Sequence, residues 1–373
     1  MSNIFLTRKC NLKCPYCFAD EFVNKNNEEI TLENFKKAVE FIKTGDSKIG
    51  LIGGEPMLHP LFSEFLDMLI SDDKIDSVIV FTNGLRIDKY INKLKHKKIH
   101  LLINCNSIKD IGEKNYEKLK YNLTILKNND NVNIGINIYS KDMDYSYIFE
   151  LLNIADKHFL RYATALPNIS KEKTYDVLNS FLKIKPLLMK FFSDCLKNYI
   201  VPVTDCNTIP DCLLNIEDKR LMIKLNQLAM KYNEKFITGY TCEPIIDILP
   251  DLNAVRCFGL SKYMKASIEE HKNMENLRNY FINQIDLYAR LSFVSKGCND
   301  CKMRMLNRCG LCFTYKMKQC EKLKDYILDN SEVIDEVFKD KVTYTTLVSK
   351  DILDKLHNYN YKIIDNIYIE KRI

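Results

Sequence analysis

The stretch Lys9-Cys10-Asn11-Leu12-Lys13-Cys14-Pro15-Tyr16-Cys17-Phe18 contains three cysteines, separated by three and by two residues. Thiolates are the protein ligands of iron–sulfur clusters, and a cubane 4Fe–4S cluster has four iron corners. Three ligands leave one iron open to bind a small molecule and pass an electron to it. Asn11 and Pro15 are typical of a loop, and the apolar run Ile4-Phe5-Leu6 predicts a short strand that ends where this loop begins.

The cysteine spacing alone leaves two other interpretations open. A Cys-x2-Cys pair also binds zinc, and three thiols can simply pack in a core. A second motif bears on the choice, because Ile49–Ile52 predicts a strand that is followed directly by Gly53-Gly54-Glu55-Pro56. Paired glycines let the backbone approach a ligand closely, and the Glu55 carboxylate can accept hydrogen bonds from an ammonium group.

Together the two motifs resemble those of radical S-adenosylmethionine (SAM) enzymes. The signature C-x3-C-x-aromatic-C is filled by Cys10, Cys14, Tyr16 and Cys17, and Gly53-Gly54-Glu55-Pro56 stands where the family holds the SAM amino group. The resemblance implies that the open iron chelates the methionine part of SAM. One electron then cleaves SAM to methionine and a 5′-deoxyadenosyl radical, which abstracts hydrogen from the substrate. It also implies that Tyr16 lies beside the adenine.

Length, composition and charge bear on whether the protein is a membrane, secreted or nucleic-acid-binding protein. The chain has 373 residues, enough for two domains, and no apolar run long enough to predict a membrane span. Its first residues do not resemble a signal peptide. Fourteen cysteines indicate metal or clusters in a reducing compartment, so we expect a cytoplasmic protein. The net charge of +6 is mild, and the one dense basic stretch, 93–98, predicts a helix end rather than a nucleic-acid interface.

Helices and strands alternate between residues 30 and 165. The apolar patterns predict helices at 31–44, 60–70, 88–97, 113–128 and 145–157, and strands at 49–52, 77–81, 99–105, 132–138 and 158–163. With the first strand this makes six β/α units, which predict an α/β fold with a parallel sheet and helices outside it. The resemblance implies a partial (β/α)6 TIM-like barrel. The cysteine loop follows the first strand and the glycine motif the second, so both are expected at the carboxyl-terminal rim.

Later strand ends supply further candidates for the SAM site. They are Asn83 in Thr82-Asn83-Gly84, Asn106 and Ser107 after the fourth strand, Asn137 on the fifth and Arg161 on the sixth. The resemblance implies that Asn83 lies near SAM and that Asn106 or Ser107 contacts its carboxylate or ribose. An ordinary Asn-Gly turn and a surface arginine remain as alternatives, although an arginine can hold a carboxylate bidentately. Cys105 is predicted to be a core thiol.

The sequence predicts four segments. Residues 1–165 form the radical SAM core, and 166–238 form a helical bridge without strands, with helices at 171–199, broken at Pro186, and at 218–232. The bridge contains a loop at 202–212, whose Cys206 and Cys212 are expected to be neither ligands nor a redox pair. Residues 239–325 form a cysteine-rich module, and 326–373 form an extension whose role the sequence leaves open.

The cysteine-rich module holds seven thiols, Cys242, Cys257, Cys298, Cys301, Cys309, Cys312 and Cys320. A strand, turn and strand are expected at 245–257 and a helix at 274–291. The two Cys-x2-Cys pairs suit one zinc ribbon. The whole pattern instead resembles a SPASM domain, a small twitch-like α+β module, and this implies two auxiliary 4Fe–4S clusters. Cys242, Cys257 and Cys312 would hold the first, and Cys298, Cys301, Cys309 and Cys320 the second.

The pattern departs from that resemblance in three ways. Leu252-Asn253 stands where the hairpin turn usually has glycine. The group of four cysteines has spacings of two, seven and two residues in place of two, five and three. Cys320 follows unusually soon. These departures bear on which thiol serves which cluster.

The resemblance implies an oxidoreductase-type maturase of ribosomal peptides, which forms a crosslink or an oxidised product. The partners expected are a peptide or protein substrate and a reductant such as flavodoxin or ferredoxin. Since the catalytic loop begins at residue 10, a leader peptide would be read either by the C-terminal part of the chain or by a separate leader-binding protein. The alternatives are an anaerobic sulfatase-maturing (formylglycine-forming) enzyme, a radical SAM enzyme on a small molecule, and a non-enzymatic metal-binding adaptor. Cys17-Phe18-Ala19 disfavours the first, which often has Cys-Phe-Tyr.

Overall fold

The computed structural model describes residues 1–316, apart from 18, 20–21, 25–27, 166–176, 205, 233–241, 262, 287–288, 290–294, 296–297, 299–300, 302–308 and 310. Three predicted features lie outside the described residues: the ligand Cys320, the 326–373 extension and the start of the 171–199 helix. Within the part of the chain that is described, no helix is both long and apolar enough to cross a membrane.

One sheet organises the described chain. Its strands are β1 (Ser2–Phe5), β2 (Lys48–Ile52), β3 (Ser77–Thr82), β4 (Ile99–Asn104), β5 (Val132–Ile138), β6 (Phe159–Thr164), β7 (Val201–Val203), β8 (Asp247–Ile248), β9 (Asn253–Val255) and β10 (Ala266–Ser267). They are ordered β10-β9-β8-β1-β2-β3-β4-β5-β6-β7. Strands β8 and β1 to β7 are parallel along this order, whereas β9 and β10 are antiparallel to their neighbours.

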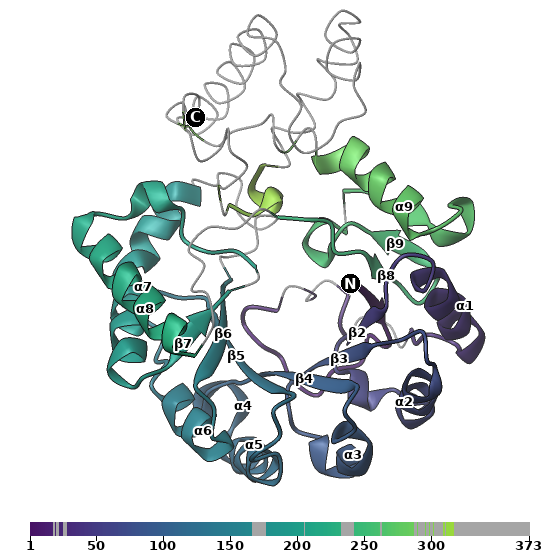
Figure 1. The fold of residues 1–373 in the computed structure, drawn as a ribbon, viewed down its shortest axis with the longest axis horizontal. Helices are drawn as coiled ribbons and strands as arrows, with labels where there is room; N and C mark the ends of the chain where they lie inside the picture. Colours follow the sequence, from purple (N-terminus) through teal and green to yellow (C-terminus); the bar gives the residue numbers. More distant parts are fainter. Residues whose placement is uncertain are drawn as a thin grey trace, which may run out of the picture.

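Helices connect the parallel strands. They are α1 (Leu32–Ile42), α2 (Phe62–Ser71), α3 (Ile87–Leu94), α4 (Ile108–Ile111), α5 (Glu113–Ile125), α6 (Tyr147–Ala155), α7 (Val177–Lys197), α8 (Ile216–Lys231) and α9 (Met274–Phe281). In Figure 1 the strands follow an arc, and α1, α2, α3, α5, α6, α7 and α8 lie on its outer side. The pairing order does not close on itself among the described strands, so the sheet is a partial barrel. The predicted α/β fold is confirmed.

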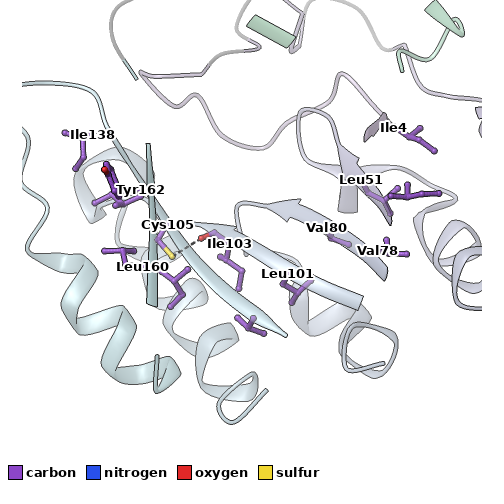
Figure 2. Packing of buried hydrophobic residues seen from close by; sticks show 14 of the residues in the cluster. Ile4, Leu51, Val78, Val80, Leu101, Ile103, Cys105, Ile138, Leu160 and Tyr162 are labelled. Carbon is purple, nitrogen blue, oxygen red and sulfur yellow. Dashed lines mark hydrogen bonds between the residues drawn. The ribbon is translucent and has the colours of Figure 1, made fainter. Parts of the chain in front are cut away.

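Strand side chains that face the helices make the core. Ile4, Leu51, Val80, Leu101 and Ile103 are fully buried and lie along neighbouring strands in Figure 2. Parallel strands covered by helices read as nearly continuous apolar runs, which is why Val78-Ile79-Val80 and Leu101-Leu102-Ile103 were recognisable. Cys105 is 1% exposed within this core, as predicted, and its thiol lies 3.6 Å from the Ile103 carbonyl oxygen.

Two features of the predicted bridge are wrong. The segment contains a strand, β7, which pairs in parallel with β6 and extends the sheet beyond six strands. Helix α7 also runs unbroken from Val177 to Lys197 with Pro186 inside it. Proline removes one amide donor from a helix. Here the burial of Phe181, Leu188 and Phe191 against the core keeps the helix continuous across that position.

The expected strand–turn–strand after Cys242 is confirmed as β8 and β9. Strand β8 also pairs with β1, so the cysteine hairpin is part of the same sheet as the cysteine loop. Leu252 occupies the turn with a φ of 64°, in the left-handed region that usually favours glycine. Its side chain is 4% exposed, and its amide donates to the Leu249 carbonyl at 3.0 Å. Burial of an apolar side chain therefore accompanies a strained backbone.

Candidate cluster and cofactor site

Two glycines bring the second strand's loop against the cysteine loop. A Cβ on Gly53 would lie 2.7 Å from the Thr7 carbonyl oxygen, and one on Gly54 would lie 2.3 Å from the Lys9 carbonyl oxygen. Neither position has room for a side chain. The space is taken by backbone hydrogen bonds of 2.8 Å, from the Gly54 amide to Thr7 and from the Glu55 amide to Lys9. The glycine motif is therefore attached to the residues that lead into Cys10.

Glu55 is buried beneath this contact and ties it to the end of β3. Its Oε1 accepts hydrogen bonds from the Thr82 hydroxyl at 2.8 Å and the Met57 amide at 3.2 Å, and its Oε2 accepts one from the Asn83 amide at 2.8 Å. Burial raises the pKa of the Glu55 carboxyl to about 6. A carboxylate has about four acceptor positions, so Oε2 has capacity for a further donor such as an ammonium group.

The three loop cysteines are partly buried and close enough to influence each other's charge. The pKa of the Cys10 thiol is raised to about 11 and that of Cys14 to about 12, mainly by burial and in smaller part by negative charge on Cys17. Three thiolates in one loop therefore require a compensating cation. The donor set fits an iron–sulfur cluster, whose ligands are thiolates. The Leu12 amide also donates to Cys10 Sγ at 3.4 Å.

A zinc ion and an iron–sulfur cluster require different arrangements of the thiol ligands. Among the residues described, no three His, Cys, Asp or Glu side chains converge closely enough to bind one ion. A mononuclear zinc site needs all its ligands within about 2.3 Å of one atom. A four-iron cube holds its ligands farther apart, because each thiolate binds a different corner.

Tyr16 connects the cysteine loop to the ends of β4 and β5. Its hydroxyl donates to Asn106 Oδ1 at 2.6 Å, and it also hydrogen-bonds with the Asn137 side chain. The Tyr16 ring packs against Tyr139, with ring centroids 5.3 Å apart. Burial raises the pKa of the Tyr16 phenol well above its ordinary value, so the hydroxyl stays protonated and can donate. The structure thus brings Tyr16, Asn106 and Asn137 together.

The other predicted rim residues occupy distinct places. Asn83 donates from Nδ2 to Asn11 Oδ1 at 2.8 Å, which joins the end of β3 to the cysteine loop. Pro56 is the first residue of the short 3-10 helix η1 (Pro56–Leu58). Ser107 caps α4, where its hydroxyl accepts from the Asp110 amide at 3.2 Å and donates to Asp110 Oδ2 at 2.8 Å. Arg161 on β6 pairs with Gly135 on β5, and Asn137 lies two residues farther along β5.

Two residues of this rim were not singled out from the sequence. Asn24 clamps the first cysteine, because its Oδ1 accepts from the Cys10 amide at 2.9 Å and its Nδ2 donates to the Cys10 carbonyl at 3.2 Å. Asn104, the last residue of β4, has a buried Oδ1 without a hydrogen-bond partner in the described part of the chain. No sequence motif near Asn24 indicates a role at the site. Asn104 lies at the end of a predicted strand, and that position indicates a rim residue.

The structure brings together three thiols of the second cysteine cluster. These thiols are Cys242, Cys257 and Cys312, and each is partly buried. Burial is the main cause that raises the pKa of Cys242 and of Cys257, and negative charge on Cys312 is a smaller cause in the same direction. Arg256 lies against Cys242, with Nη1 donating to its Sγ at 3.1 Å. Three grouped thiols beside a cation are a donor set that fits a cluster. These are the residues expected for the first auxiliary site.

Cys298, Cys301 and Cys309 act electrostatically on Cys212, a thiol that the sequence did not predict to be a ligand. Cys212, on the 3-10 helix η2 (Asp211–Leu213), has its pKa raised to about 11, first by burial and then by charge on these three thiols. The loop before it is fixed by Asn207, whose Nδ2 donates to the Tyr315 hydroxyl at 2.7 Å. The bridge thus contributes a fourth thiol to this neighbourhood.

The described residues thus form a parallel β/α partial barrel with a three-cysteine loop at its carboxyl rim. A model of the radical SAM superfamily matches residues 4–152. This part of the chain is a radical SAM domain. Among curated relatives, the GTP 3′,8-cyclase of Vibrio atlanticus is 32% identical over 108 residues, which cover 28% of this chain and 32% of the relative. The chain thus spans about a third of that relative's length.

Solved structures resemble a larger part of the chain. Streptococcus suis SuiB bound to S-adenosylmethionine superposes with a TM-score of 0.54 at 16% identity, over 85% of this chain and 73% of SuiB. At that identity the likeness concerns the fold. SuiB bound to its precursor peptide SuiA superposes with a TM-score of 0.48 at 15% identity, over 75% of this chain and 63% of that chain.

Proposed function

We propose that the protein binds SAM and a 4Fe–4S cluster at the carboxyl rim and abstracts hydrogen from a residue of a peptide or protein. The observation that supports this most is the contact between the two glycines and the cysteine loop. Through it, the loop that carries the buried Glu55 carboxylate contacts the residues that lead into Cys10, within the part of the chain that matches the radical SAM superfamily. A metal-binding adaptor has no need of that carboxylate.

Each rim residue has a role in this proposal. Cys10, Cys14 and Cys17 would hold the cluster, which together with SAM would supply a 5′-deoxyadenosyl radical. Glu55 Oε2 would accept a hydrogen bond from the SAM amino group, while Asn83 keeps the glycine motif joined to the loop. Tyr16 presents its ring to the adenine, and the Asn106 hydrogen bond sets the angle of that ring.

The two C-terminal groups of thiols would hold auxiliary clusters. Cys242, Cys257 and Cys312 supply three ligands to the first. Cys298, Cys301 and Cys309 supply three to the second, and either Cys320 or Cys212 completes it. Such clusters would accept the electron left on the substrate after hydrogen abstraction. The assignment of the C-terminal part as a SPASM-like module is supported by these groupings together with the cysteine pattern.

A peptide is the substrate class that the likeness in fold favours. SuiB, whose fold the chain shares, has been solved with its precursor peptide. The second candidate is a small molecule such as a nucleotide, and the observation that favours it is the sequence similarity to GTP 3′,8-cyclases within the radical SAM domain. Incubation with GTP separates the two. If GTP is consumed and increases 5′-deoxyadenosine formation, the small-molecule function replaces the peptide one.

The decisive experiment combines metal analysis with SAM cleavage. Anaerobically reconstituted protein is compared with a Cys10→Ala/Cys14→Ala/Cys17→Ala variant, and Cys105→Ala serves as a control for loss of a core thiol. We expect about twelve irons in the parent and in the control, and about four fewer in the triple variant. Dithionite should release 5′-deoxyadenosine from all but the triple variant. Zinc in place of iron, or iron without SAM cleavage, would overturn the proposal.

A further inference from the structure

A buried ion pair lies directly behind the first auxiliary thiol group. Arg256 is 1% exposed and Asp286 is fully buried. The pair is bidentate, with Arg256 Nε donating to Asp286 Oδ1 at 2.7 Å and Nη2 donating to Oδ2 at 2.8 Å. Asp286 ends the short π-helical segment Ile282–Asp286 that continues from α9, thirty residues beyond the arginine. The reaction proposed above uses neither residue.

The far edge of the guanidinium faces Cys242. Nη1 donates to Cys242 Sγ at 3.1 Å, and Nη2 donates to the Cys242 carbonyl oxygen at 3.0 Å. The face of the group covers the Phe313 ring at 4.9 Å, next to Cys312 in the chain. Arg256 is thus held on two edges and one face, so its Nη1 has a fixed direction toward the sulfur.

Packing alone does not account for this arrangement. Removing two charges from water costs several kcal/mol for each ion, and an apolar pair of similar volume often serves a core as well or better. What an apolar pair cannot supply is a donor aimed at a thiolate. Arginine also stays protonated under all ordinary conditions, and its planar fork allows one edge to be anchored while the other donates.

We propose that Arg256 tunes the reduction potential of an auxiliary cluster bound by Cys242, Cys257 and Cys312, by donating an N–H···S hydrogen bond to Cys242. Asp286 is the positioning residue for the guanidinium. This inference rests on the auxiliary cluster of the proposed function, and it does not depend on the substrate or on SAM cleavage.

The direction of the effect follows from charge. Reduction adds one electron to the cluster and no proton, so the thiolate sulfurs become more negative. Hydrogen bonds to the sulfurs are among the protein's means of setting cluster potentials. A donor and a positive charge at Cys242 stabilise the reduced form more than the oxidised form, and so raise the potential. Asp286 offsets the net charge, which leaves the directed N–H as the local effect.

The test is a redox titration followed by electron paramagnetic resonance. It uses the reconstituted full chain carrying Cys10→Ala, Cys14→Ala and Cys17→Ala, so that only auxiliary clusters give a signal. Arg256→Met/Asp286→Leu removes the pair without leaving a buried charge. Arg278→Met is the matched control, because Arg278 also pairs with an aspartate, Asp46, but is 26% exposed. We expect the midpoint potential of the double variant to be about 59 mV lower than that of the parent. For a one-electron couple, this corresponds to a reduced-to-oxidised ratio about tenfold smaller at the parent's midpoint.

Each outcome decides the matter. An unchanged midpoint in the double variant, an equal shift in Arg278→Met, or a parent without an auxiliary signal would overturn the inference. If the double variant does not retain iron, Arg256→Lys is used, which keeps the charge but loses the fork. A lowered midpoint potential at full iron content, in the double variant or in Arg256→Lys, supports the inference. Loss of iron in Arg256→Lys as well would show that Arg256 is needed to form the cluster site and does not tune its potential. SAM cleavage is measured separately on protein with an intact cysteine loop, so failure of that activity leaves this result standing.

Discussion

Gly54 lies so close to Lys9 that a methyl group on it would stand 2.3 Å from the Lys9 carbonyl oxygen and 3.0 Å from Cys10 Cβ. The obstacle is backbone, so it cannot rotate away as a flexible side chain would. We expect Gly54→Ala to separate the glycine motif from the cysteine loop. Iron content should fall by about four, SAM cleavage should be lost, and the auxiliary clusters should remain.

Gly112→Ala is the control for that substitution. Gly112 adopts a positive φ of 77°, and a Cβ there would meet nothing within 4 Å. It should cost about 1 kcal/mol of stability and leave iron content unchanged. Full iron and activity in Gly54→Ala would contradict the view that this contact builds the site.

Tyr16→Phe tests the link between the cysteine loop and β4. The substitution removes the 2.6 Å hydrogen bond to Asn106 but keeps the ring. A hydrogen bond of this kind contributes about 1 kcal/mol, so the Kd for SAM should rise about fivefold at unchanged iron content. Calorimetry of SAM binding measures this. The control is Tyr139→Phe, because the Tyr139 ring packs against Tyr16 but its hydroxyl donates to Asp110. This variant should change the Kd for SAM less than Tyr16→Phe does.

Asp247 makes stability depend on pH. It is buried between β8 and β1, where it accepts from Asn3 Nδ2 at 2.6 Å, and burial raises its pKa from 3.8 to about 7. The folded state therefore binds a proton more tightly than the unfolded state over this range. The contribution of Asp247 to the free energy of unfolding is greatest below about pH 4, falls as the pH rises toward 7, and is level above that.

The Asp247→Asn variant should lack this step. Urea unfolding of the variant and the parent between pH 4 and 8 gives the difference directly, and the contributions of other groups cancel. We expect the parent to lose at least about 1 kcal/mol relative to the variant as the pH rises. Asp251→Asn, on the exposed hairpin turn, is the control and should follow the parent. A parallel pH profile for the parent and Asp247→Asn would contradict the prediction.

Leu252 allows strain and burial to be separated at one position. Leu252→Ala loses the buried side chain and keeps the φ of 64°, whereas Leu252→Gly loses the side chain and relieves the backbone. The alanine variant should be destabilised by about 2–4 kcal/mol. The glycine variant should be more stable than it by about 1 kcal/mol, the reverse of their usual order. Thermal unfolding of both would show this, and an alanine variant as stable as the glycine variant would exclude strain at the turn.

Cys212 and Cys320 compete for the last place in the second auxiliary site. If Cys212 is the ligand, Cys212→Ala should lower iron content by between about one and about four, because one iron of the second auxiliary cluster then lacks its thiolate. Cys206→Ala, an exposed cysteine of the same loop, is the control and should keep its iron. Loss of iron in Cys320→Ala with full iron in Cys212→Ala would assign the place to Cys320.

The parallel core was predictable because its strands are continuous apolar runs, and because the loops after the first two strands carry the three cysteines and the Gly53-Gly54-Glu55-Pro56 motif. The positions of Cys10, Glu55 and Asn83 at one rim follow from the rule that parallel strands end at the same edge. Other features depend on contacts distant in sequence. Val201-Pro202-Val203 is too short and contains proline, so only its pairing with β6 makes it a strand. The contact between Arg256 and Asp286 joins residues thirty positions apart that no local pattern connects.

Strand β1 lies inside the sheet, between β2 and β8, and one of these neighbours comes about 240 residues later in the chain. Contacts between segments so far apart form slowly, because a long loop must close first. On the ribosome, the strand that leads into Cys10 would keep an unpaired edge until residue 248 has emerged. Such an edge is prone to association with other chains. Production of the holoprotein should therefore benefit from slow synthesis, with iron supplied after the chain is complete.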